Sequence, residues 1–167
     1  MRPMSAAACA YVAAMIDAEG VVSIGRVGGS KRPGQEFAYR PLVIVTNSHA
    51  GLIGFLADVT GEGITYHNRK PPRPNWSPMH RWQCTCACAQ RVLEAILPYL
   101  VIKREIAEIV LRFQATPKKT TFTERSAIRV IQTGLYEQVK RLNTRGAGSH
   151  RSAMTLTDYP ADHPLLL

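Results

Sequence analysis

The sequence predicts an α+β domain in which a four-stranded antiparallel sheet carries helices on one face and leaves its other face open. Two observations lead to this prediction. Alternating apolar and polar residues mark four short strands in two hairpins, and segments of helical periodicity precede, separate and follow them. The chain has 167 residues, 46% of them hydrophobic and 20% charged, which suffices for one domain with its own core. The expected order of elements is αββαββα, with further helices after it.

The first half of the chain should form a helix, a hairpin and a second helix. Its alanine-rich start has high helix propensity, and serine and glycine stand at the expected helix ends. The expected elements are a helix from the N-cap Ser5 to about Ala18 that Gly20 ends, strands 21–27 and 37–46 around a polar loop, and a helix capped by Ser48 that Gly61 ends. Arg26 falls on the strand face that should be core, so we expect a bulge or an early strand end there.

The second half repeats this pattern and then becomes helical. The expected elements are strands 64–70 and 81–87 around a proline-rich loop, followed by helices 89–97, 102–114 and 123–143. Pro98 should bend or break the chain between the first two of these helices. Residues 1–145 are therefore predicted to form one domain, and residues 146–167, which lack periodicity, a C-terminal tail.

The charge balance predicts a polyanionic partner. Twenty-one Lys and Arg residues face twelve Asp and Glu residues, which leaves a formal charge of +9 and a pI near 9.8. Nucleic acid is the commonest partner of so basic a domain, although a basic surface can also serve solubility alone. No carboxylate occurs between Gly63 and Leu93, a stretch that contains five arginines and lysines. The positive charge thus concentrates in predicted strands and turns, which indicates a basic sheet surface.

No part of the sequence suggests a membrane or a secreted protein. The apolar stretch 6–16 runs directly into Asp17 without a convincing cleavage region, and no stretch is long enough to span a bilayer. We expect an intracellular protein, in the cytoplasm, nucleoid or an organelle, with no membrane partner. Cys84, Cys86 and Cys88 alternate without a Cys-x-x-Cys pair, and their spacing from His80 suits zinc poorly. They and Cys9 are expected to be small apolar residues in a reducing compartment.

The end of the first helix carries the chemistry. Ala10, Ala14 and Ala18 are spaced by four residues and line one side of the helix, where small residues let a second helix approach closely. Asp17 and Glu19 stand at its C-terminus, where the helix dipole disfavours negative charge. Stability explains these carboxylates poorly, and a bound cation explains them better.

Residues 11–20, YVAAMIDAEG, resemble the signature of the LAGLIDADG homing endonucleases in their small residues, two acids and closing glycine. Residues 97–104, LPYLVIKR, resemble the family's Pro-aromatic-Leu stretch that a lysine follows, and Asn47 stands where the family carries a polar residue near its active site. The element order agrees from about Ser5 to Asn143. The chain departs from the family at Glu19, where aspartate is more usual, and at Ala14 and Ala18, which replace glycines.

The resemblance implies a site-specific homing endonuclease. The motif occurs once in this sequence, and single-motif chains of the family form homodimers in which each subunit gives one acid to a shared centre, so a homodimer is implied as well. The implied substrate is a long, roughly palindromic double-stranded DNA, with no small-molecule substrate. Glu19 and the Ala18 backbone carbonyl are the implied ligands of Mg²⁺, or of another divalent cation such as Mn²⁺, or Ca²⁺ in a non-cleaving complex. Glu19, Lys103 and Asn47 are the implied catalytic residues, and Asp17 is expected to be structural. The expected dimer interface comprises Tyr11, Ala14, Met15 and Ala18.

The open face of the sheet is expected to lie in the major groove of DNA, with alternate side chains toward the bases. The polar side chains of the strands should face the DNA, while Trp82, Cys84 and Cys86 should face the core. The expected DNA-binding residues are Ser23, Gly25, Lys31, Arg32, Gln35, Arg40, Tyr66, Asn68, Lys70, Arg73, Arg81, Gln83 and Thr85.

Two other functions compete with the nuclease. A catalytically silent DNA- or RNA-binding protein of the same fold, such as an intron-encoded maturase or a regulator, would be indicated by loss of the metal-binding acid, but Glu19 is present. A general RNA-binding domain would carry aromatic stacking residues on its sheet, for which Tyr66 and Trp76 are the candidates.

Overall fold

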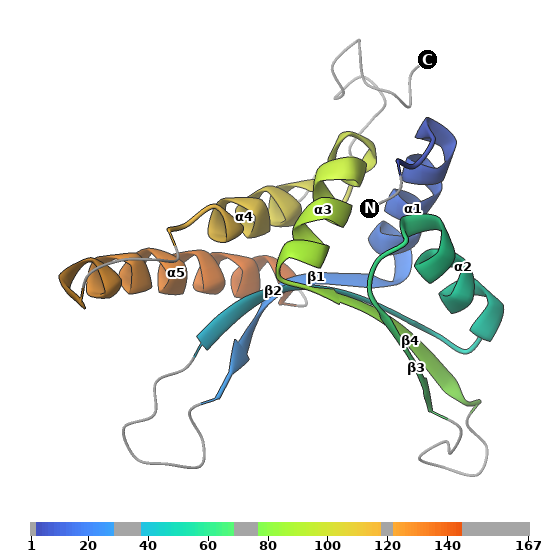
Figure 1. Ribbon diagram of the computed structural model, residues 1–167, viewed down its shortest axis with the longest axis horizontal. Coiled ribbons are helices and arrows are strands. Elements are labelled where there is room, and N and C mark those ends of the chain that lie inside the picture. Colours follow the sequence, from blue (N-terminus) through green and yellow to red (C-terminus); the bar gives the residue numbers. More distant parts are fainter. Residues whose placement is uncertain (1–2, 29–37, 69–76, 118–121, 145–167) are drawn as a thin grey trace.

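A computed structural model describes residues 3–28, 38–68, 77–117 and 122–144. They form one open sheet with helices on a single face, and Figure 1 shows the sheet curved like a saddle beneath the helices. In chain order the elements are α1 (Ala6–Glu19), β1 (Gly20–Val27), β2 (Ala38–Asn47), α2 (Ala50–Thr60), β3 (Ile64–Asn68), β4 (Met79–Thr85), α3 (Ala87–Ile96), a 3₁₀ turn (Leu97–Tyr99), α4 (Arg104–Gln114) and α5 (Phe122–Asn143). The predicted fold class is confirmed.

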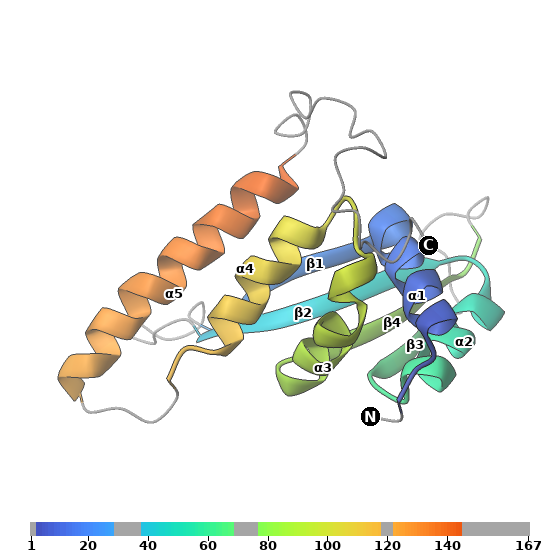
Figure 2. The same ribbon diagram turned by 90° about the horizontal axis from the view of Figure 1, so that it is seen from above.

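The sheet consists of two antiparallel hairpins joined side by side in the order β1-β2-β4-β3. β2 pairs with β1 from Gly20↔Val45 to Val27↔Ala38, and with β4 from Leu42↔Thr85 to Asn47↔His80. Seen from above, α4 and α5 lie over the β1–β2 half and α2 lies over the β3–β4 half (Figure 2). In the part of the chain that the structure describes, this arrangement leaves the opposite face of all four strands without a covering helix.

The core lies between the sheet and the helices. Alternate strand residues point into it, among them Val22, Val43 and Trp82, and α1 contributes Val12 and Ile16, all fully buried. Burial of this apolar surface is the main force that holds the helices on the sheet. No helix in the described ranges is long and apolar enough to cross a membrane.

The predicted irregularity at Arg26 is wrong. β1 continues without a bulge through Arg26↔Tyr39 to Val27↔Ala38, and Arg26 is exposed. The residues before it on the same strand face, Val22 and Ile24, are buried. The strand therefore runs past the covered part of the sheet, where a charged residue on the helix-facing side still reaches water.

β4 ends two residues earlier than predicted, so Cys86 is not a core strand residue. Its backbone takes a positive φ of 52°, its N–H donates to the Pro41 carbonyl at 3.0 Å, and its side chain is exposed. The alternation of cysteines continues across this turn and into α3, which starts at Ala87. The sequence pattern alone could not reveal the turn because residue type alternates in the same way on both sides of it.

Two helix boundaries have other causes than those predicted. His49, not Ser48, caps α2, because its Nδ1 accepts the Leu52 N–H at 3.2 Å. Gly20 has an extended backbone and begins β1. A Cβ at Gly20 would lie 2.7 Å from the Ile16 backbone, so glycine serves close packing rather than a left-handed turn there.

Candidate functional site

The C-terminus of α1 is tied to the loop before α4 by Asp17. Its carboxylate accepts the backbone N–H of Val101 at 2.7 Å, of Ile102 at 3.2 Å and of Lys103 at 2.8 Å. The side chain is largely buried, at 9% exposure, so these three bonds replace the water that it loses. Asp17 therefore has the structural role that the family resemblance implied. The expectation from the helix dipole was wrong for this residue, because backbone N–H groups rather than a cation account for its charge.

Lys103 completes this connection in the opposite direction. Its Nζ donates to the Ile16 carbonyl at 2.9 Å and also to the Asp17 carbonyl, both in the last turn of α1. A cation suits that place because the free carbonyls of a helix C-terminus carry partial negative charge. Burial lowers the pKa of Lys103, and the negative charge of Asp17 partly opposes this shift. The structure thus places the Lys103 ammonium group at the end of α1, where it binds the carbonyl of Asp17, two residues before Glu19.

Glu19 is exposed at the end of α1 and is held by Asn47 at the end of β2. The Asn47 Nδ2 donates to the Glu19 Oε2, while the Asn47 Oδ1 accepts the His49 N–H at 2.8 Å. The second bond fixes the orientation of the amide, so its NH₂ group faces the carboxylate. The two residues are 28 positions apart in the chain, and the antiparallel pairing of β1 with β2, in which Gly20 lies opposite Val45, brings the end of β2 to Glu19.

The residues at this helix end fit a hard divalent cation only in part. Glu19 offers one carboxylate, and the Ala18 carbonyl is not among those that Lys103 binds. The described residues contain no group of three or more His, Cys, Asp or Glu side chains able to hold a metal ion. Mg²⁺ commonly binds through one or two carboxylates and takes its other ligands from waters and phosphates. One chain therefore supplies a fraction of such a site.

The side of α1 away from the core is apolar and exposed. Tyr11, Ala14 and Ala18 are exposed there, and Met15 is partly exposed. Tyr11 meets Phe55 of α2 edge to face, with ring centroids 5.2 Å apart and the planes at 80°. Phe55 is 42% exposed and was not predicted for this surface. The sequence signal that could have placed Phe55 on this surface is a large aromatic residue on the outer side of α2, where its neighbours are small.

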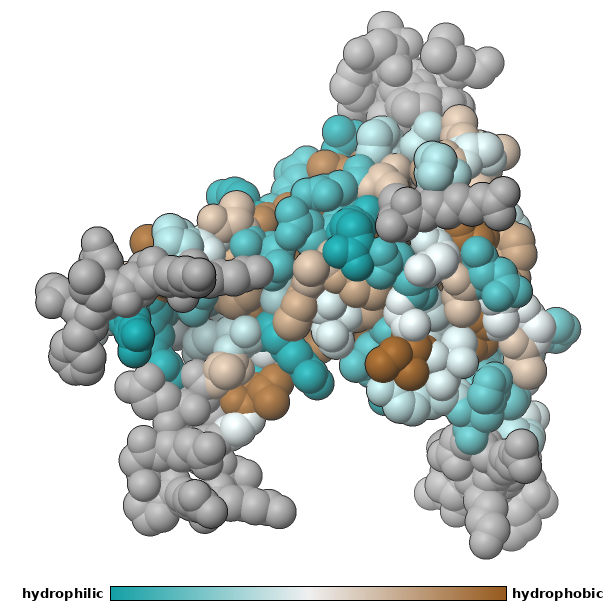
Figure 3. Space-filling view, viewed as in Figure 1, coloured by the Kyte–Doolittle hydropathy of each residue, from teal (hydrophilic) through white to brown (hydrophobic). Residues whose placement is uncertain are grey.

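The open sheet face carries the polar residues predicted on β4, together with apolar residues. Trp82 and Cys84 are buried, so Arg81, Gln83 and Thr85 point to the other face. By the same alternation, the further residues on this face are Val21, Ser23, Gly25, Val27, Ala38, Arg40, Leu42, Ile44, Thr46, Ile64, Tyr66 and Met79. In the backbone register Asn68 pairs with Met79. Figure 3 shows the hollow under the helices with hydrophobic side chains on both sides of its rim.

The described strands show part of the positive charge that was predicted for this face. Within the described strands its cationic residues are Arg40 and Arg81. Lys31, Arg32, Gln35, Lys70 and Arg73 lie outside the described residues.

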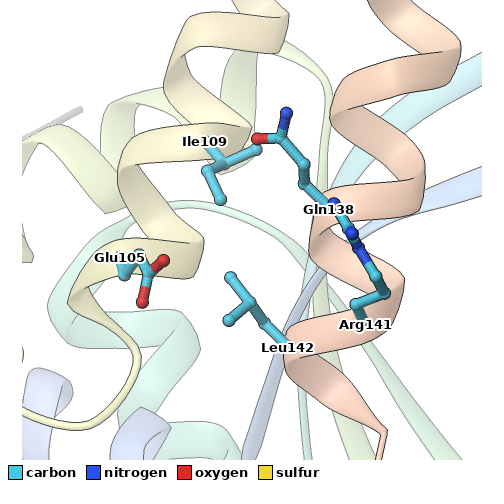
Figure 4. A pocket seen from close by; sticks show the side chains of 5 residues that line it. All are labelled: Glu105, Ile109, Gln138, Arg141 and Leu142. Carbon is cyan, nitrogen blue, oxygen red and sulfur yellow. The ribbon is translucent and has the colours of Figure 1, made fainter. Parts of the chain in front are cut away.

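The helix layer holds a small pocket between α4 and α5, which Figure 4 shows from close by. Glu105, Ile109, Gln138, Arg141 and Leu142 line it, and its volume is about 150 Å³. Ligand pockets usually measure about 300–1,000 Å³. The exposed acid at the end of α1 is therefore a better candidate site than this pocket.

Solved structures with the same architecture are homing endonucleases. The homing endonuclease I-CvuI, in complex with its target in the presence of Ca, is 24% identical, with a TM-score of 0.64 over 83% of this chain and 82% of that chain. This chain has the LAGLIDADG homing-endonuclease fold. I-CvuI with the I-CreI target and Mg, its DNA not cleaved, gives 22% identity and a TM-score of 0.65 over 88% of this chain and 85% of that chain.

Two further structures extend the likeness at lower identity. The archaeal intron-encoded homing endonuclease I-Vdi141I, complexed with DNA, is 12% identical, with a TM-score of 0.62 over 83% of this chain and 85% of that chain. The LAGLIDADG meganuclease I-AabMI, bound to uncleaved DNA, is 12% identical, with a TM-score of 0.52 over 80% of this chain and 42% of that chain. No protein-family model matches the sequence, and no curated protein matches it.

Proposed function

We propose that this chain is a homodimeric, site-specific DNA endonuclease that hydrolyses both strands of a long, roughly palindromic target with the help of divalent metal ions. The observation that carries the proposal is the exposed Glu19 carboxylate at the end of α1, which Asn47 holds in place. The LAGLIDADG homing-endonuclease fold supports it, and so does the net charge of +9. The activity belongs to the dimer, because one chain offers a single acid of this kind.

The exposed side of α1 supports a two-fold dimer. Its small residues Ala14 and Ala18 let two helices approach closely, and Tyr11 and Met15 add apolar surface beside them. Because Glu19 follows Ala18 directly, packing α1 against its copy brings two Glu19 carboxylates to the same place. A two-fold protein then matches a target whose halves are related by the same symmetry.

In this proposal Glu19 and the Ala18 carbonyl hold the metal ions, with Mg²⁺ as the expected physiological ion and Mn²⁺ as a substitute. Bound metal supplies an activated water and a Lewis acid at the phosphate. Asn47 orients Glu19 through its fixed amide, which is a positioning role rather than direct contact with the attacking water. Lys103 neutralises the carbonyls of the last helical turn and adds positive charge next to the phosphate.

The open sheet face contacts the DNA in this proposal. Arg40 and Arg81 supply charge on the described strands, and alternate polar side chains reach base edges in the major groove. The proposed contacts on the described strands are Ser23, Gly25, Arg40, Tyr66, Asn68, Arg81, Gln83 and Thr85. Lys31, Arg32, Gln35, Lys70 and Arg73, which lie outside the described residues, are the other proposed contacts, and the positive charge of the lysines and arginines among them suits phosphate.

Incubation with a library of randomised DNA in the presence of Mg²⁺, followed by sequencing of the cleaved ends, tests the proposal. A recurrent, nearly palindromic cleaved sequence is the expected result. Specific binding without cleavage would refute the nuclease and favour the catalytically silent DNA- or RNA-binding protein of the same fold, a maturase or a regulator.

Glu19→Gln gives a sharper test of the acid. It keeps the size of the side chain and its contact with Asn47, but it removes the charge that holds the metal. We expect DNA binding within about threefold of the unmodified protein and a loss of cleavage of at least a hundredfold, an order of magnitude typical of an essential group. Glu94→Gln, an exposed glutamate on α3, is the matched control and should cleave normally. Full activity of Glu19→Gln would show that another acid holds the metal ions.

A further inference from the structure

The open face of the sheet carries a row of apolar side chains that a purely phosphate-binding surface does not need. The register places Val21 opposite Ile44, Ile44 opposite Gln83, and Gln83 opposite Ile64, so one cross-strand row runs over all four strands. We call Val21, Ile44, Gln83 and Ile64 the central row. Val21 is 46% exposed, Ile64 is 62% exposed, and Ile44 and Gln83 are partly exposed.

The core does not explain these residues. The strand neighbours Val22, Val43 and Val45 are fully buried on the helix side, so Val21 and Ile44 point to the face that no helix covers. Apolar side chains exposed in the middle of a sheet gain nothing in water, which indicates that a partner covers them.

The position of the row identifies that partner. Val21 is two residues after Glu19, so the row begins next to the proposed cutting centre. The neighbouring row, which consists of Thr46, Arg81 and Tyr66, adds positive charge on the same face. A surface that is apolar at its centre and cationic beside it fits double-stranded DNA, whose thymine methyl groups are the main apolar feature of the major groove.

We propose that the central row selects A·T base pairs close to the cleavage positions. Val21 and Ile44 pack against the C5 methyl groups of thymines, and the Gln83 amide bonds to the edge of an adenine, the base whose N6 and N7 match a glutamine. A G·C pair offers this surface no methyl group, and it leaves the polar edge of cytosine against apolar side chains. The proposal rests on the proposed function, since it names what the same DNA-binding face reads.

Deoxyuridine scanning of the selected target tests the inference directly. Each thymine is replaced, one at a time, by deoxyuridine, which pairs identically but lacks the methyl group, and binding is measured by fluorescence anisotropy. At one or more thymines near the cleavage positions we expect about fourfold weaker binding, the effect of losing one buried methyl group. The same substitutions should leave binding of Val21→Thr and Ile44→Thr dimers unchanged, because these variants keep β-branched side chains but lose apolar contact.

Val27→Thr is the matched control, because Val27 lies on the same face at the far end of β1. It should show the same deoxyuridine effect near the cut as the unmodified protein. If no thymine gives a loss that disappears in the Val21 or Ile44 variants, the central row does not read methyl groups and the inference is overturned, while cleavage of the target keeps the proposed function intact. Failure to select any DNA would overturn both.

Discussion

Replacing Asp17 by asparagine removes the charge that joins α1 to the loop before α4 while keeping the size of the side chain. In the structure Oδ2 accepts the N–H groups of Val101 and Ile102, and Oδ1 accepts that of Lys103. An asparagine has one acceptor oxygen, so its NH₂ group must face at least one of these donors. One or two part-buried N–H groups then lose their partner.

The magnitude follows from that count. Each buried donor left without a partner costs about 1–3 kcal/mol, and bonds to a charged acceptor are worth about 1.5–3 kcal/mol. We therefore expect Asp17→Asn to lower the free energy of unfolding by about 2–4 kcal/mol, a large part of the stability of a domain of this size. Urea titration followed by circular dichroism, at fixed protein concentration, measures this loss.

Asp58→Asn is the matched control for this experiment. Asp58 is an exposed aspartate on α2, so its change should alter the free energy of unfolding by less than about 0.5 kcal/mol. If Asp17→Asn has an equally small effect, the three hydrogen bonds from the loop before α4 do not stabilise this end of α1, and the structural role assigned to Asp17 is wrong.

The same substitution changes the titration of Lys103. The charge of Asp17 raises the pKa of Lys103 against the opposing effect of burial. Removing that charge should lower the pKa of Lys103 further, which NMR titration of its side chain detects. An unchanged pKa would mean that the two side chains do not interact electrostatically.

Three further predictions follow from the fold. Arg91 donates two hydrogen bonds to the Glu62 carboxylate, with N–O distances of 2.6 and 2.9 Å, and these bonds lower the pKa of Glu62. The ion pair therefore stabilises the folded state above pH 4.5, and this contribution is lost as the pH falls through the folded-state pKa of Glu62. Arg91→Met should thus lower the urea midpoint at pH 7, and this loss should shrink as the pH falls below 4.5, whereas an equal loss at every pH would refute the ion pair. Gly20→Ala should cost about 1–3 kcal/mol in urea titration and reduce cleavage, because its Cβ meets the Ile16 backbone at 2.7 Å; normal stability would show that α1 ends differently. Ala14→Glu should make the protein monomeric in light scattering and abolish double-strand cleavage, and a stable dimer would exclude this face of α1 as the interface.

Local residue patterns sufficed for much of the fold. Ser5 and Gly61 stand at helix boundaries where a side-chain cap and a left-handed glycine are needed, and the structure has both. The alternation of Trp82 with Arg81 and Gln83 gave the correct faces of β4. Such features depend on contacts between residues that are close in the chain, so the sequence reveals them.

Predictions failed where local patterns are ambiguous. The apolar type of Cys86 continues the strand alternation, although the backbone turns there. Arg26 suggested a bulge because its face should be core, but β1 extends beyond the region that the helices cover. Whether a strand position is buried depends on which elements pack over it, and this is a property of the whole fold.

The sequence by itself determined the α+β class and the helix whose end carries Asp17 and Glu19, because periodicity and capping residues are local signals. The structural role of Asp17 was implied by the family resemblance, and distant backbone N–H groups create it in the structure. Only the tertiary structure decided what surrounds Glu19. It brought Asn47 to Glu19 across 28 positions of the chain and Lys103 to Asp17 across 86 positions. It also aligned Val21, Ile44 and Ile64 into one row. These contacts join distant segments, and their register follows from packing the whole core rather than from any single stretch of residues.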